Sequence, residues 1–368
     1  MTPARVFADA ARSIVEVCRA GLDPDGLRSE VLRRLRRAVP VDALWWANAD
    51  PATLLFTRAH REGIPERVTP YFVDNEFIAQ DVNKWVDLAR DRDGVRTLTQ
   101  ATHGVLSRSP RYLDVFQPLG LGDELRAALR DQGTCWGFLC LHREAGRPFT
   151  AQDARFVQRL SPHIAAAIRM GLATSSLEVC AVADSPGVLL LDADAALVTS
   201  TTAADRWLEE MGHPTGTELP MPTEVYAVAA LLRRMEATES AVPRLRVRTR
   251  AGRWAVLHAS RLPTAGRDGI AVVIEEASAA EVAPIVMLAY GLSDQERKVT
   301  GLVCQGASTA EIAIDLRIST NTVQDHLKSV FDKVGVRSRG ELAARILREQ
   351  YVPRARAGRP LGPGGFFA

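Results

Sequence analysis

Polar and basic side chains near the C-terminal end of the sequence have the types and spacing that bind nucleic acid. Asn321, Gln324 and Lys328 recur every three or four residues, so a helix would place them on one side. Amides and ammonium groups of this kind bond base edges in the major groove of DNA. Four basic side chains can bond phosphates: Lys328, Lys333, Arg337 and Arg339.

An amphipathic helix beginning after Ser319 is predicted to position these groups. Ser319 is a candidate N-cap, because its hydroxyl can accept from an amide in the first turn. One apolar stripe on this helix consists of Val323, Leu327, Val330, Phe331 and Val334. The candidate DNA contacts are Ser319, Thr320, Asn321, Thr322, Gln324, Asp325, Lys328, Lys333, Arg337 and Arg339.

The charge distribution favours a DNA-binding helix over the alternative, which is an ordinary helix surface exposed to solvent. From Tyr290 to Ala368 there are twelve Lys/Arg against eight Asp/Glu, a surplus of four. The whole chain has a formal net charge of only +2. Any affinity for nucleic acid is therefore expected to be local to this end of the chain.

Two shorter helices are predicted just before the basic helix. Ser293 with Glu296, and Ser308 with Glu311, each fit a capping box. Gly306 stands where a left-handed residue would end the first of the two helices. A helix-turn-helix follows from this spacing.

The segment 291–347 resembles the LuxR-type helix-turn-helix, also called NarL- or GerE-type, of bacterial transcription regulators. The resemblance implies four helices, with the Thr322-Val323…His326 helix in the major groove and the next helix at a dimer contact. The sequence departs from the family at Gln324, where a lysine is usual, and at the acidic Asp325. The matching residues are Leu292–Glu296, Val299, Gly306–Ser308, Glu311–Ala313, Leu316, Ile318–Ser319, Thr322–Val323, His326–Leu327, Lys333 and Val336–Arg339.

Length and composition predict two or three domains without a membrane segment. The chain has 368 residues, of which 46% are hydrophobic. No apolar run approaches the roughly 20 residues that span a bilayer, and no signal-peptide core is present at the start. We therefore expect a cytoplasmic protein.

Cysteine and histidine patterns predict neither a disulfide framework nor a metal site. The five cysteines are scattered and odd in number, which suits a reducing compartment. Cys135 and Cys140 are five apart on a probable strand and should face opposite sides. No histidine pair has metal-ligand spacing, so no metal and no cofactor are expected.

The N-terminal part is predicted to be an α+β domain. Helices are expected within 4–39, around 68–78 and 110–116, and from Thr150 to about 172, with strands at 42–48, 54–59, 122–130 and 134–142. This order, with the Pro148-Phe-Thr150…Asp153 helix start, resembles a GAF domain, a small-molecule sensor. The resemblance implies a pocket between the sheet and the central segment, although each aromatic could equally be core. The pocket candidates are Trp45, Trp46, Phe56, Tyr71, Phe72, Trp85, Trp136 and Cys140.

A second α+β pattern follows. A strand, turn and strand at 187–198 precede helices at 203–211 and 224–238 and three strands at 244–250, 254–262 and 269–275. This order resembles a PAS domain, with Thr199–Thr202 where the family usually has an asparagine. Neither a haem-ligand histidine nor a flavin-binding cysteine motif is evident, so the resemblance implies dimerisation or signal relay.

The predicted organisation is multidomain: residues 1–174 GAF-like (α+β), 175–280 PAS-like (α+β), 281–350 an all-α four-helix LuxR-type module, and 351–368 a flexible tail. A phosphate-binding loop, a nucleophile motif and paired carboxylates are absent from the sequence, so no enzymatic activity is expected.

The resemblance implies a one-component transcription regulator that binds double-stranded promoter DNA as a homodimer, with a small-molecule effector and RNA polymerase as further partners. Two alternatives remain open. One is a sensory or dimerisation scaffold that binds DNA only non-specifically. The other is an acyl-homoserine-lactone-type quorum sensor.

Overall fold

The computed structural model describes residues 3–174, 185–213, 218–235, 242–264 and 267–346. The chain divides into two compact units, Met1–Gly171 with Val182–Glu276 and Leu172–Ala181 with Ala277–Ala368. Within the described ranges, no helix has both the length and the apolar character needed to span a membrane.

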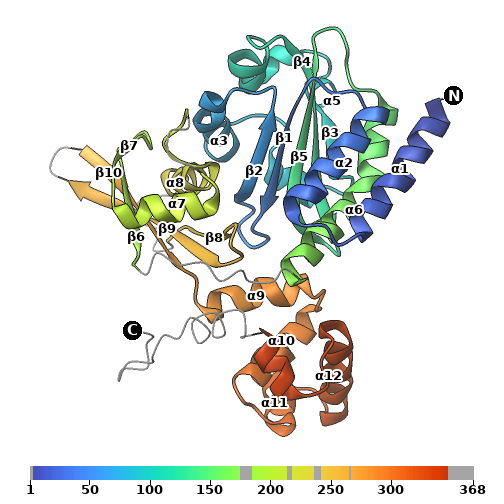
Figure 1. Ribbon diagram of the computed structural model, residues 1–368, viewed down its shortest axis with the longest axis vertical. Coiled ribbons are helices and arrows are strands. Elements are labelled where there is room, and N and C mark those ends of the chain that lie inside the picture. Colours follow the sequence, from blue (N-terminus) through green and yellow to red (C-terminus); the bar gives the residue numbers. More distant parts are fainter. Residues whose placement is uncertain (1–2, 175–184, 214–217, 236–241, 265–266, 347–368) are drawn as a thin grey trace. The chain divides into compact units, whose positions relative to one another are not determined.

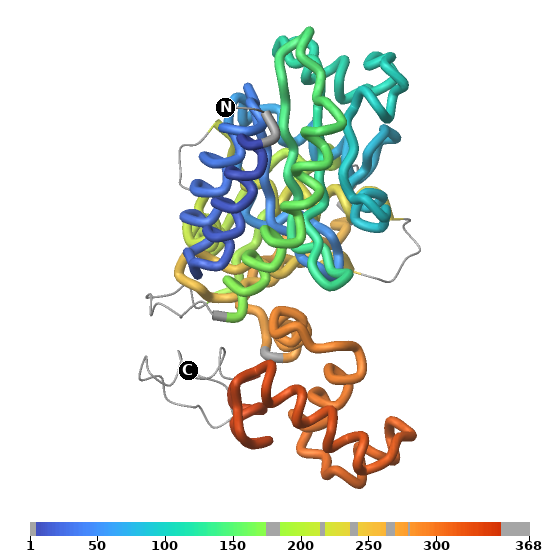
Figure 2. Tube along the Cα trace, turned by 90° about the vertical axis from the view of Figure 1, so that its right-hand side faces the viewer, coloured from blue at the N-terminus to red at the C-terminus, as the bar shows by residue number. Residues whose placement is uncertain are grey.

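The first unit begins with a five-stranded antiparallel sheet in the order β2-β1-β5-β4-β3. Its helices α1, α2 and α6 lie together in both views (Figures 1 and 2). Phe7 of α1 meets Phe156 of α6 edge-on, with ring centroids 4.9 Å apart. The bounds are α1 Pro3–Arg19, α2 Pro24–Ala38, β1 Ala43–Ala49, β2 Phe56–Glu62, β3 Val95–Thr97, β4 Leu121–Asp131, β5 Thr134–Glu144 and α6 Ala151–Thr174.

The strand β1 explains why the sheet is covered on both faces. Leu44, Trp45 and Trp46 stand in succession, and all three side chains are buried. Successive side chains of a strand point to opposite faces, so both faces of β1 need cover. The central segment between β2 and β4 is built from short helices: 3-10 helices Glu66–Val68 and Leu106–Arg108, α3 Thr69–Phe77, α4 Trp85–Arg90, α5 Leu98–Ala101 and the π-helix Tyr112–Phe116.

A second five-stranded antiparallel sheet, in the order β7-β6-β10-β9-β8, completes the first unit. The predicted strand-turn-strand, two helices and three-strand meander are all present. The PAS resemblance rests on this order alone. The bounds are β6 Gly187–Leu191, β7 Leu197–Ser200, α7 Thr202–Met211, α8 Thr223–Arg234, β8 Arg244–Arg248, β9 Trp254–Thr264 and β10 Arg267–Glu276.

Helix α8 joins the cores of the two sheets. Its residues from Thr223 to Ala230 are all buried, because α8 contacts α3 as well as β9. Phe56 and Trp85 of the first sheet domain belong to the same apolar cluster as Val225 and Leu257. The two sheets therefore share one compact unit and one apolar cluster.

Ion pairs reinforce this junction. The guanidinium of Arg246 in β8 binds the buried Asp50 carboxylate through Nη2 at 2.7 Å and through Nε at 2.8 Å. Arg233 of α8 binds both oxygens of Asp74 at 2.8 Å. The Arg246–Asp50 pair is bidentate, so it fixes orientation as well as adding electrostatic attraction.

The second unit is helical, as predicted for the C-terminal part. It contains α9 Ala279–Ala289, α10 Asp294–Cys304, α11 Thr309–Leu316 and α12 Thr320–Val334, and residues 339–346 form a further helix. Both predicted capping boxes, at Ser293 and Ser308, are present. Gly306 adopts the predicted left-handed conformation, with φ 88°. The predicted tail 351–368 lies outside the described residues.

Candidate functional site

Helix α12 is held in place by its ends and by one apolar stripe. The Ser319 hydroxyl accepts from the amide of Thr322 at 3.0 Å, which confirms the predicted N-cap. At the other end, Gly335 takes the left-handed conformation that closes the helix. The stripe Val323, Leu327, Val330 and Val334 is buried. The remaining sides of the helix are turned away from the core.

The outward side of α12 carries the predicted base-contacting groups. Asn321, Gln324, Asp325 and Lys328 are all exposed, as is Thr320 in the first turn. Their spacing of three and four residues places them along one strip of the helix surface. This strip can present two amides and one ammonium to a groove, with one carboxylate among them.

The hydroxyls of Ser319 and Thr322 at the start of α12 are already used locally. Ser319 Oγ and Thr322 Oγ1 lie 2.8 Å apart, within hydrogen-bond distance, and Ser319 also caps the helix. The helix start can still offer a phosphate its backbone amides, which are favourable for anions at a helix N-terminus, and the exposed side chain of Thr320.

Lys333 is engaged within its own unit. Its Nζ bonds Glu296 Oε1 at 2.9 Å and Oε2 at 2.7 Å, and Ser329 Oγ donates to Glu296 Oε1 at 2.7 Å. Glu296 also accepts from the amide of Ser293 at 2.6 Å. Burial alone would raise the pKa of the Glu296 carboxyl, but these donors lower it to about 2. Glu296 therefore ties the start of α10 to the second half of α12.

Arg339 also has a structural role in the same unit. Its guanidinium donates to the carbonyl of Ala307 at 2.9 Å and to Thr309 Oγ1 at 3.0 Å. These contacts hold the turn that leads into α11. Arg337 has an exposed side chain, and its amide donates to Glu341 at 2.8 Å. Of the four predicted phosphate contacts, Lys333 and Arg339 are engaged within the unit, whereas Lys328 and Arg337 have exposed side chains.

The positive charge is less concentrated on the described domain than the sequence count suggested. Residues 290–346 hold eight Lys/Arg and seven Asp/Glu, a surplus of one rather than four. The other basic side chains of the count fall in 347–368, outside the described residues.

The predicted effector pocket is filled by aromatic packing. Five of its eight candidates, Trp45, Phe56, Phe72, Trp85 and Cys140, belong to one buried apolar cluster, with Tyr71 packed against it. Trp45 meets Phe56 edge-on at a centroid distance of 4.7 Å. Trp46 and Trp136 are buried elsewhere. These side chains act as core in this conformation, which is the alternative that the sequence left open.

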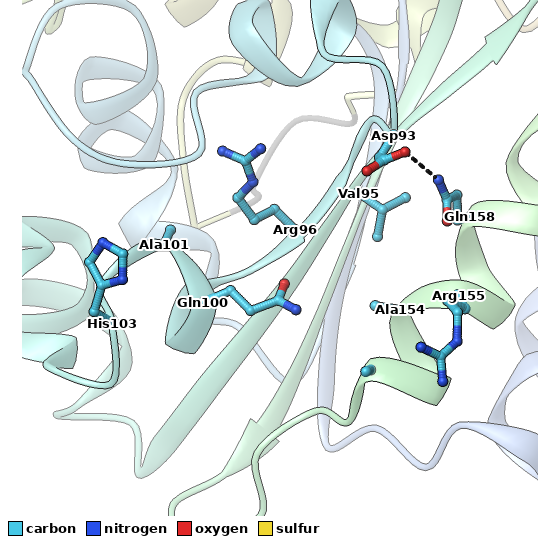
Figure 3. Close-up of a pocket in the computed structure, with 10 residues that line it drawn as sticks. Asp93, Val95, Arg96, Gln100, Ala101, His103, Ala154, Arg155 and Gln158 are labelled. Atoms are coloured by element: carbon cyan, nitrogen blue, oxygen red, sulfur yellow. Dashed lines mark hydrogen bonds between the residues drawn. The ribbon is translucent and has the colours of Figure 1, made fainter.

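Two pockets in the first unit lie away from those aromatics. One, of about 470 Å³, opens beside β3 and the start of α6 (Figure 3). Another, of about 210 Å³, is lined by charged side chains that include Arg58, Arg61 and Glu224. Neither includes any of the eight predicted residues. The lining of the larger pocket is Asp93, Val95, Arg96, Gln100, Ala101, His103, Ala151, Ala154, Arg155 and Gln158.

A buried ionic network crosses the face of the first sheet that the central segment covers. Arg111 Nη2 binds Glu124 Oε2 at 2.7 Å, and Arg126 Nε binds Glu124 Oε1 at 2.9 Å. Arg126 Nη1 also binds Glu76 at 2.8 Å. Burial would raise the pKa of Glu124, but the two guanidiniums hold it below its usual range. The sequence reasoning did not find this network.

Two known protein families match segments of this chain. Residues 291–346 match the family described as bacterial regulatory proteins, luxR family, and residues 4–168 match the GAF domain. The spore germination protein GerE of Bacillus subtilis (strain 168) is 39% identical over 57 residues, which are 16% of this chain and 77% of that protein. The chain belongs to the LuxR family of bacterial regulatory proteins.

Other relatives match the same module of this LuxR-family chain. The probable HTH-type transcriptional regulator GfsR of Streptomyces halstedii is 39% identical over 56 residues, 15% of this chain and 23% of that protein. The match thus spans about a quarter of that relative. The GAF domain of a phosphoenolpyruvate-protein phosphotransferase (ptsP) from Coxiella burnetii aligns with 45% of this chain and 95% of that chain, at 18% identity and a TM-score of 0.34.

One turn in this LuxR-family module departs from what its sequence suggests. Helix α11 ends at Leu316, and Arg317 then adopts the left-handed conformation with φ 55°. Glycine or asparagine is usual at such a position, so no residue signal marked it. The amide of Ile318 bonds the carbonyl of Ala313 at 3.0 Å and completes the turn into α12.

Proposed function

We propose that this LuxR-family protein is a sequence-specific DNA-binding transcription regulator of the one-component type. The observation that supports it best is the exposed strip of α12, with Asn321, Gln324 and Lys328 presented on a helix whose other side is packed and whose start is capped. Such a helix can enter a major groove and bond base edges. It acts in the cytoplasm, where bacterial promoters are found.

The proposed organisation retains the sequence boundaries: a GAF domain to residue 174, a PAS-like domain to 280, the DNA-binding module to 350 and a tail. A homodimer on a twofold-related site would place its two recognition helices about 34 Å apart, one turn of DNA. The small-molecule effector is received in the first unit, and RNA polymerase is the further partner at the promoter. No catalytic step is required.

The decisive experiment is selection of bound duplexes from a random pool by the full-length protein, followed by a footprint on the enriched site. We expect two half-sites protected about one helical turn apart. Binding that falls with salt but shows no sequence preference would overturn sequence recognition and favour the scaffold alternative.

Lys328→Ala tests the recognition strip. If Lys328 bonds a base, the substitution weakens binding to the selected site by about 1–3 kcal/mol and leaves binding to random duplex nearly unchanged. Lys298→Ala is the matched control, since Lys298 is an exposed lysine of the same unit on α10. Equal loss on selected and random DNA would instead make Lys328 a phosphate contact.

A further inference from the structure

The smaller of the two pockets, about 210 Å³ in volume, lies where β2 of the first sheet approaches the second sheet. Segments that are far apart in the sequence build its wall: the start of α2, the middle of β2, the end of α7, the start of α8 and the turn between β8 and β9. Sites for drug-sized ligands measure about 300–1,000 Å³, so this pocket suits a smaller molecule.

Arg58 reaches this pocket from a distorted part of β2. The pairing of β2 with β1 shifts there, so that Arg58 and Ala59 stand opposite the single residue Ala47. Arg58 also has a left-handed backbone, with φ 52°, which is unfavourable for a residue with a long side chain. Bulges re-aim side chains, and strained backbone is concentrated at binding and catalytic sites. The distortion at Arg58 therefore points to a binding role for this wall.

Three guanidiniums of the wall act on one carboxylate. Arg28 Nη1 lies 2.9 Å from Asp25 Oδ1, and Arg58 Nη2 lies 3.1 Å from Asp25 Oδ2. Burial would raise the pKa of the Asp25 carboxyl, but Arg58, Arg28 and Arg250 hold it below its usual range. Arg250 Nη2 donates to the carbonyl of Gly212 at 3.1 Å, and Arg250 forms no ion pair within the described residues. The wall thus has more guanidinium groups at this point than one carboxylate can satisfy.

The other carboxylates of the wall already have partners. Glu66 is paired with Arg61. Glu224 is buried and accepts from the amide of Arg58 at 2.6 Å, and burial raises the pKa of its carboxyl. The lining holds four arginines and three acidic residues, a surplus of one positive charge. Acidic groups beside the lining are also engaged: Glu62 with Arg36, Glu218 with Arg67, and Asp23 with the amides that begin α2.

We propose that this pocket binds one small polar monocarboxylate of the hydroxy-acid class, held by the guanidiniums of Arg58 and Arg250. A planar guanidinium can bond a carboxylate through two parallel N–H groups. A single negative charge matches the surplus of the lining, whereas a phosphate group carries about −1.5 to −2 at pH 7 and would exceed it. Polar side chains elsewhere in the lining, such as Thr223 and His60, suit the hydroxyl groups of the ligand.

The test is calorimetric titration of the full-length protein with glycolate, lactate and glycerate, each compared with its uncharged amide and with inorganic phosphate. We expect one saturable site per chain for at least one of the acids, and at least tenfold weaker binding of its amide. Arg250→Gln should weaken binding of that acid by tenfold or more. Arg206→Gln is the matched control and should leave binding unchanged, because Arg206 is an exposed arginine of α7 outside the lining.

Four outcomes of the titration would overturn the proposal. They are the absence of saturable binding for all three acids, equal binding of acid and amide, tighter binding of phosphate than of any acid, and equal effects of Arg250→Gln and Arg206→Gln.

Hydrogen exchange of the unmodified protein keeps the proposal testable if Arg250→Gln fails to fold. The bound acid should slow exchange in peptides that cover 57–62 and 248–253, because both segments contribute to the wall. Protection confined to 93–103, which lines the larger pocket, would overturn this placement of the ligand.

This inference deepens the proposed function by naming the class of effector received in the first unit, and it rests on that function only for its consequence at DNA. Binding of the acid is measured without DNA. A chain that binds its selected DNA site but none of the acids would refute the pocket alone. A chain that binds an acid but no specific DNA would refute the proposed function alone.

Discussion

Glu296→Gln should destabilise the DNA-binding module more than an ordinary helix-cap substitution does. The Glu296 carboxylate accepts from Ser293, Ser329 and Lys333, so it joins two helices as well as capping one. A hydrogen bond to a charged group contributes roughly 1.5–3 kcal/mol. The Lys333 side chain is 38% exposed, which weakens the contribution of the Lys333–Glu296 ion pair to stability. We therefore expect a loss of about 2–3 kcal/mol in the free energy of unfolding.

Glu311→Gln is the matched control, because Glu311 holds the same position in the capping box of α11 but is exposed. Loss of such a cap costs about 0.5–2 kcal/mol, and glutamine can still reach the cap amide. All six tryptophans lie before residue 277, so their fluorescence does not report on this unit. Hydrogen exchange of peptides from 291–346 in the full chain measures the stability of this unit directly.

The pH dependence of stability is a second test of the role of Glu296. The folded-state pKa of Glu296 is lowered from 4.5 to about 2, so its stabilisation is present above pH 4.5 and is lost as pH falls toward 2. Linkage limits this contribution to about 3 kcal/mol, and partial exposure of Lys333 reduces it to about 1–2 kcal/mol. Equal losses of unfolding free energy in Glu296→Gln and Glu311→Gln would refute this role of Glu296. Identical acid sensitivity in Glu296→Gln and the unmodified protein would also refute it.

Two further predictions follow from other contacts. Arg337→Ala should reduce the slope of log affinity against log salt concentration by about one and leave sequence preference intact, because the exposed Arg337 side chain is placed for a phosphate. Gel shifts over a series of salt concentrations measure this slope. An unchanged slope would remove Arg337 from the interface. Asp50→Asn should destabilise the first unit by about 3 kcal/mol, since it leaves the Arg246 guanidinium without its buried anion. Tryptophan fluorescence during urea unfolding measures that loss, and Asp9→Asn, at an exposed carboxylate, is its control.

The features that the sequence predicted well are those encoded over a few residues. Ser308 and Glu311 form a capping box within one helical turn, and the apolar spacing of α12 is set by a single helix. Arg317 was not recognisable, because a left-handed arginine has no side-chain signature. Helix existence was therefore easier to predict than the turn that orients the helices.

The roles that were missed depend on contacts between distant segments. Lys333 is 37 residues from Glu296, and no local pattern shows that its charge is already paired. Cys140 and His142 are two residues apart on one strand, but Glu124 meets them only through the register of β4 with β5. Aromatic content likewise could not distinguish a ligand pocket from the packed core around Trp85.

Helix α8 has a consequence for how such regulators can be recombined. Because its residues from Thr223 to Ala230 are buried between β9 and α3, separating the two sheet domains would expose an apolar surface on each part. The smallest piece of the sensor that can be exchanged between proteins as a folded module then contains both sheets, and a hybrid joined between them would expose that apolar surface.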